Sequence, residues 1–148
     1  MYKYVDRPLS TLDEGCRFLV ASMRGWVTAI SKRNCPAQML APAFARWRLI
    51  GALQPFHRLM LILNREALDT LQFCPVGCNH VSEHEAILLE LVTSLRERGA
   101  GETRQTLELV VAEDAVGDLL DTLTRIGAAM AIAGIFPGEV APVRGPRD

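Results

Sequence analysis

The stretch Ser82–Leu95, SEHEAILLELVTSL, carries both the start signal and the apolar face of one helix. Ser82 and Glu85 have the spacing of a capping box, in which the serine hydroxyl and the glutamate carboxylate satisfy backbone N–H groups reciprocally. The apolar positions that follow repeat at helical spacing: Ile87, Leu88, Leu91, Val92 and Leu95. The pattern predicts an amphipathic helix that faces a core, and we expect Gly99–Gly101 to end it.

Similar patterns predict helices through most of the chain. Thr11-Leu12-Asp13-Glu14 has the spacing of another capping box, so we expect a helix over residues 11–31. Its apolar stripe consists of Cys16, Val20, Met23, Val27 and Ile30. Further helices are expected at 37–50, 56–68, 103–112 and from 114 into the small-residue stretch Gly127–Ala131. The prediction is an all-α, single-domain bundle of about five to six helices over residues 1–136. Residues 137–148 are rich in Pro and Gly and are predicted to be a disordered tail.

Composition predicts self-association. The chain has 148 residues, of which 49% are hydrophobic, and a chain this short has much surface for little interior. We therefore expect apolar surface to remain after one core is filled, and predict a homodimer formed by the first or the last helix. Another protein partner would also fit such a surface.

Charge is distributed unevenly between the two halves. Residues 1–74 carry ten Lys and Arg against five Asp and Glu, and residues 75–148 carry six against twelve. The basic residues are scattered and no nucleic-acid motif accompanies them, so nucleic-acid binding is not predicted. Packing of the two halves together, or pairing across a dimer, explains the asymmetry.

The sequence favours the cytoplasm. The start, MYKYVDRPLS, lacks the apolar region of a signal peptide, and no stretch has the roughly 18 uncharged apolar residues that a membrane span needs. In that compartment the four cysteines are expected to be thiols, metal ligands or core residues.

A metal site is the leading specific hypothesis. The segment preceding the capped helix, Phe73–Val81, contains Cys74-x3-Cys78 with His80 two residues beyond, and His84 follows in the first helical turn. Thiolate and imidazole are the ligands that zinc prefers, and closely spaced pairs are common in its sites. The predicted ligands of zinc or iron are therefore Cys74, Cys78, His80 and His84. All four fall within one short loop, which is cramped for a single tetrahedral metal, and His57 or Cys35 would complete the ligand shell from another segment.

Two alternatives use the same residues without metal. In the first, Cys74 and Cys78 form a reversible disulfide and the protein senses thiol redox state. In the second, the protein is a helical interaction module whose cysteines build a turn and whose histidines are a helix-start hydrogen bonder, His84, and an exposed loop residue, His80. The Cys-Pro dipeptides at Cys35 and Cys74 also resemble a short motif of haem-responsive proteins.

Enzymatic activity finds little support. The chain has no G-x-S-x-G, no phosphate-binding glycine loop and no H-E-x-x-H. Glu83 and Glu85 are explained by capping and by the helix dipole. The sequence thus favours binding or regulation over catalysis.

The segment Cys74–Cys78, followed by Val81-Ser82-Glu83 and the leucine-rich stretch 86–95, resembles an uncharacterised family of small all-helical bacterial proteins in which a Cys-rich turn precedes a capped helix. The likeness extends loosely over residues 15–130. It implies an all-α fold without an assigned activity, so it transfers no catalytic residue and leaves the histidines unexplained.

Overall fold

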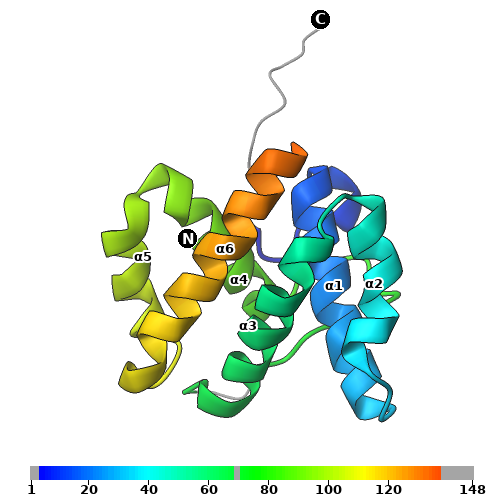
Figure 1. Ribbon diagram of the computed structural model, residues 1–148, viewed down its shortest axis with the longest axis horizontal. Helices are drawn as coiled ribbons and strands as arrows, with labels where there is room; N and C mark the ends of the chain where they lie inside the picture. The colour runs from blue at the N-terminus through cyan, green and yellow to red at the C-terminus, as the bar shows by residue number, and fades with distance from the viewer. Residues whose placement is uncertain (1–3, 69–70, 138–148) are drawn as a thin grey trace, which may run out of the picture.

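The computed structural model describes residues 4–68 and 71–137, and this part of the chain forms six α-helices (Figure 1). They are α1 (Glu14–Ser31), α2 (Pro36–Arg46), α3 (Leu53–Glu66), α4 (Glu83–Glu97), α5 (Gly99–Leu107) and α6 (Val116–Ala133). Short 3-10 turns occur at η1 (Leu9–Thr11), η2 (Ile50–Ala52) and η3 (Glu113–Ala115). The described residues contain no strand, only two isolated β-bridges. The predicted all-α fold is confirmed, whereas residues 138–148 of the predicted tail lie outside the described residues.

The helices pack around one hydrophobic core. α6 lies between α5 and α3 (Figure 1) and also contacts α4, while α1 packs against α2 and α4. Large side chains that are almost completely buried come from all six helices: Met23, Phe44, Phe56, Leu89, Leu107 and Leu119 are among them. Rings of Phe18, Phe44 and Phe56 form a chain of edge-on and tilted contacts that joins α1, α2 and α3.

The predicted capping box at Thr11 is wrong. The N-cap of α1 is Asp13, whose carboxylate accepts from the backbone N–H of Cys16 at 2.8 Å. Thr11 instead belongs to η1, where its hydroxyl donates to the carbonyl oxygen of Pro8 at 2.7 Å. Because that turn already uses the threonine hydroxyl, the helix begins two residues later, at a side chain that is an equally good cap.

The boundary between α4 and α5 also differs from the prediction. α4 ends just before Gly99, as expected, and Gly99 has a left-handed φ of 86°, at which glycine is favoured. The next helix begins at Gly99 itself and ends at Leu107, whereas we expected residues 103–112. Thr103 explains the early start, because its buried hydroxyl donates to the Gly99 carbonyl at 3.0 Å and bonds Ser94 of α4 at 2.6 Å.

Most of the apolar stripe of α1 is buried in the core of its own chain. Cys16, Val20 and Met23 are buried there, and Ile30 is 44% exposed. In the small-residue stretch of α6, Gly127 and Met130 are buried. Because most of the α1 stripe is buried within the chain, the predicted homodimer would have to form through other apolar surface.

The two halves of opposite charge are packed together. Buried Arg24 of α1 pairs with Glu85 of α4, and exposed Arg58 of α3 pairs with Asp118 of α6. Both pairs join a basic residue of the first half to an acidic residue of the second. In the part of the chain that the structure describes, no helix is long and apolar enough to cross a membrane.

Candidate functional site

The segment that links α3 to α4 holds the predicted site residues and is anchored by the first turn of α4. The backbone N–H of Gln72 donates to Nδ1 of His84 at 2.8 Å, and the hydroxyl of Ser82 donates to the Gln72 carbonyl at 3.2 Å. His84 therefore acts as a helix-start hydrogen bonder, one of the readings that the sequence left open.

The predicted capping box of α4 is confirmed. The backbone N–H of Glu85 donates to the Ser82 hydroxyl at 3.2 Å, and the backbone N–H of Ser82 donates to the Glu85 carboxylate at 2.9 Å. Unlike the glutamate of an ordinary surface capping box, Glu85 is completely buried. A buried carboxylate has to be paired and hydrogen-bonded to be tolerated, so its partners define the site.

Arg24 is the partner of this carboxylate. Its Nε donates to Oε2 of Glu85 at 2.8 Å and its Nη2 donates to Oε1 at 2.9 Å. Both side chains are at most 1% exposed. The two parallel bonds have the geometry in which a guanidinium binds a carboxylate most strongly.

Arg24 and Glu85 also hold the backbone of the cysteine segment. The remaining guanidinium donors bind the carbonyl oxygens of Cys78, at 2.8 Å, and His80, at 2.7 Å. Oε2 of Glu85 accepts from the backbone N–H of Cys74 at 3.0 Å. The ion pair thus fixes the backbone at both cysteines.

The two cysteines flank a tight turn. The backbone N–H of Cys78 donates to the Pro75 carbonyl at 3.0 Å, and the thiols of Cys74 and Cys78 lie close enough for each to shift the pKa of the other. Both thiols are free and partly accessible. The Cys78 sulfur also lies 3.5 Å from the His80 carbonyl oxygen and 3.7 Å from Nδ1 of His80.

The two thiols differ in acidity. The pKa of Cys78 falls to about 7, because a backbone hydrogen bond at His80, the Cys74 thiol and the His80 ring favour the thiolate. Burial raises the pKa of Cys74, and its hydrogen bond to Cys78 raises that pKa further. Cys78 is therefore the sulfur that ionises first, with Cys74 as a protonated neighbour.

The four predicted metal ligands are brought together only in part. Cys74, Cys78 and His80 lie around the turn, whereas the Nδ1 atom of His84 is occupied by Gln72. Among residues 4–68 and 71–137, no three His, Cys, Asp or Glu side chains form a group that could hold a metal ion.

The other residues considered from the sequence lie apart from the turn. Cys16 is buried in the core, and Cys35 is exposed at the N-cap of α2. His57 accepts a hydrogen bond at Nδ1 from the indole N–H of Trp26, at 2.9 Å.

Neither the role of Arg24 nor the burial of Glu85 was predicted from the sequence patterns. A signal for Arg24 was present, since it follows Val20 by four residues and precedes Val27 by three. An arginine at the edge of an apolar stripe is expected to need a buried acidic partner. The partner itself, 61 residues away, is identified only by the fold.

Comparison with protein-family models, curated proteins and solved structures found no match. The resemblance to a family of small helical bacterial proteins stays a prediction.

Proposed function

We propose that this protein is a thiol-based redox sensor in which Cys74 and Cys78 form a reversible disulfide. The observation that carries the proposal is the closeness of the two thiols across the turn, near enough for each to shift the pKa of the other, with both sulfurs free and partly accessible. Three residues separate them, so closing the bond constrains a short loop that is already folded.

A peroxide is the oxidant class that this arrangement suits. The Cys78 thiolate attacks one peroxide oxygen, an S–O bond forms, the O–O bond breaks, and the departing oxygen leaves as water after taking a proton. The Cys74 sulfur then attacks the Cys78 sulfenic acid, the S–S bond forms, and the S–O bond breaks to release a second water. Two thiols lose two electrons in total, and the peroxide is reduced to two molecules of water. A dithiol reductant returns the pair to thiols by exchange.

Disulfide formation would change the backbone around the turn, because neighbouring segments are hydrogen-bonded to it. The two sulfurs have to approach to about 2.05 Å to form a disulfide, and the turn must adjust. Its backbone is held by Arg24, and residues 79–81 pair with the N-terminal segment: Asp6 N–H donates to Val81 O at 2.9 Å and Leu9 N–H to Asn79 O at 2.8 Å. A change at Cys78 is therefore transmitted to the segment 6–9.

The proposal places the protein in the cytoplasm, where the glutathione and thioredoxin systems keep thiols reduced until an oxidant appears. Zinc or iron binding is less well supported, because only two thiols and one imidazole lie at the turn while His84 binds Gln72. If the two thiols do not form a disulfide, the remaining interpretation is a helical interaction module in which the cysteines only build the turn.

Thiol titration with disulfide mapping tests the proposal. Protein purified without an affinity tag is treated with equimolar hydrogen peroxide, and free thiols are counted before and after. We expect loss of two thiols, a Cys74–Cys78 disulfide by mass spectrometry and recovery with dithiothreitol. The Cys35→Ser variant should behave like the parent, and Cys78→Ser should lose no thiol pair.

Two results would contradict the proposal. One is retention of all four thiols under conditions that oxidise a small-molecule thiol. The other is stoichiometric zinc or iron by elemental analysis, released in Cys78→Ser, which would restore the metal hypothesis.

The homodimer also belongs to the proposal, because the described surface still has exposed apolar residues on α6. Ile132 is 88% exposed, and Ala128 and Ala131 on the same helix are exposed as well. Sedimentation equilibrium at micromolar concentration should give a dimer mass that falls to the monomer in Ile132→Asp. A monomer mass for the parent would remove the homodimer.

A further inference from the structure

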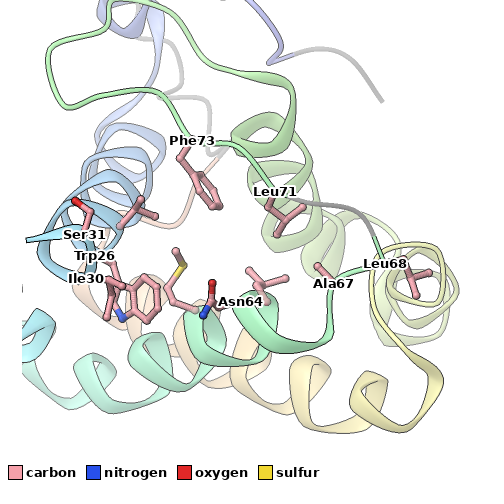
Figure 2. Close-up of a pocket in the computed structure, with 11 residues that line it drawn as sticks. Trp26, Ile30, Ser31, Asn64, Ala67, Leu68, Leu71 and Phe73 are labelled. Carbon is pink, nitrogen blue, oxygen red and sulfur yellow. The ribbon is translucent and has the colours of Figure 1, made fainter. Parts of the chain in front are cut away.

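A cavity of about 420 Å³ lies between α1, α3 and the segment 71–73 (Figure 2). This volume is within the range of small-molecule sites in proteins. Apolar side chains dominate the described residues that line it, and two uncharged polar residues, Ser31 and Asn64, complete that set, which contains no charged residue. An ion entering such a site would lose its hydration without gaining a charged partner among these residues.

The segment 71–73 forms one wall of the cavity, and hydrogen bonds to the start of α4 hold it in place. Leu71 and Phe73 alternate with Gln72 along the linking segment, so their side chains point to the opposite side from that of Gln72, and Figure 2 shows both directed toward α3. The backbone of Gln72 is bound on its far side by His84 and Ser82. Because α4 anchors this wall, the segment is kept from collapsing onto α3.

The facing wall is rigid and aromatic. Trp26 is only 3% exposed, and its indole N–H donates to Nδ1 of His57 at 2.9 Å, which fixes the ring. Met60 and Leu63 beside it are also buried. A flat apolar molecule in the cavity would lie between this wall and the Phe73 ring.

Apolar surface at the cavity is left partly uncovered by the chain itself. Phe73 and Leu71 are half-buried, Ile30 is 44% exposed and Leu68 is 59% exposed. Covering apolar surface contributes about 25 cal/mol for each Å² removed from water. An apolar occupant would therefore gain binding energy from several side chains at once.

We propose that this cavity is a binding site for a small, uncharged, aromatic or otherwise apolar molecule. The walls, the volume and the lack of a charged side chain among the described lining residues support an apolar ligand whose single polar group meets Asn64 or Ser31. The site uses neither cysteine of the turn, so the proposal stands apart from the redox function.

A matched pair of fluorescent probes tests the class of ligand. N-phenyl-1-naphthylamine is uncharged, and 8-anilinonaphthalene-1-sulfonate has the same rings with a sulfonate added. We expect saturable binding of one neutral probe per chain, with the sulfonate binding weaker by about tenfold or more. Equal or tighter binding of the sulfonate would overturn the assignment to uncharged ligands.

Two variants place the binding in this cavity. Ala67→Phe and Asn64→Phe, both at lining positions, should each weaken the neutral probe by about tenfold or more. The control Ala131→Phe adds the same ring at an exposed position of α6 and should leave affinity within about twofold. Circular dichroism verifies that each variant is folded. Because two variants each place a ring in the cavity, the other still tests the site if one of them unfolds.

Three results would overturn the site: no saturable binding to the parent, unchanged affinity in the folded fill-in variants, or affinity that falls as protein concentration rises. The last would show that a second copy of the chain occupies the cavity.

Discussion

The guanidinium of Arg24 and the carboxylate of Glu85, 61 residues apart in the chain, form a two-bond ion pair inside the bundle. The same two groups bind the backbone of Cys74, Cys78 and His80. One buried pair therefore joins α1 to α4 and also fixes the turn that carries the thiols. Stability of the fold and geometry of the candidate site depend on the same atoms.

Arg24→Met should lower the free energy of unfolding by about 3–5 kcal/mol, because it leaves the Glu85 carboxylate buried without its partner. Urea denaturation followed by circular dichroism measures this change. The matched control is Arg125→Met, which breaks an exposed pair with Asp121 and should cost at most about 0.5 kcal/mol. Similar losses of unfolding free energy in the two variants would mean that the Arg24–Glu85 pair does not stabilise the packing of α1 on α4.

Two substitutions decide where α1 is capped. Asp13→Ala should destabilise the protein by about 1 kcal/mol, because it removes the acceptor of the Cys16 N–H. Thr11→Ala removes only an exposed hydrogen bond to Pro8 and should cost less than about 0.5 kcal/mol. Unfolding midpoints in urea separate the two effects. The reverse order would restore the cap predicted from the sequence.

Alkylation of Cys78 should depend on pH with a midpoint near 7. The thiolate is the reactive form, so the rate should rise through pH 7 and level off above it. Iodoacetamide labelling at a series of pH values, read for each peptide by mass spectrometry, gives the profile. Cys74→Ala removes one hydrogen bond to the thiolate and should move the midpoint upward. A parent midpoint near 8.5, the value of an unperturbed thiol, would contradict the proposed acidity.

Gly15→Ala should destabilise the protein by about 1–3 kcal/mol. A methyl group at this position would overlap the carbonyl oxygen of Ile135, and its nearest neighbours are all backbone atoms of Ile135 and Pro137, which cannot move aside as a flexible side chain can. The control Gly117→Ala adds its methyl to open space on the exposed side of α6 and should stabilise by about 0.5–1 kcal/mol. Thermal unfolding of both variants gives the comparison, and a stabilised Gly15→Ala would show that the segment after α6 does not pack on α1 as described.

Features that depend on neighbours along the chain could be predicted from the sequence. The apolar spacing in 82–95 and the Ser82–Glu85 pair predicted α4 and its cap, because helix periodicity and capping involve residues three or four apart. Where two capping residues competed, at Thr11 and Asp13, local spacing did not discriminate, since the choice depended on the turn that Thr11 forms with Pro8.

The contacts of each side chain in the cysteine segment depend on how the whole chain folds. The sequence grouped Cys74, Cys78, His80 and His84 as equivalent ligands, yet the fold turns His84 to Gln72 and leaves the two thiols in contact. It also brings Arg24 beneath the turn from a helix more than fifty residues earlier. Such pairings follow from the packing of α1 against α4, and packing between distant segments is set by the sum of many apolar contacts rather than by any local pattern.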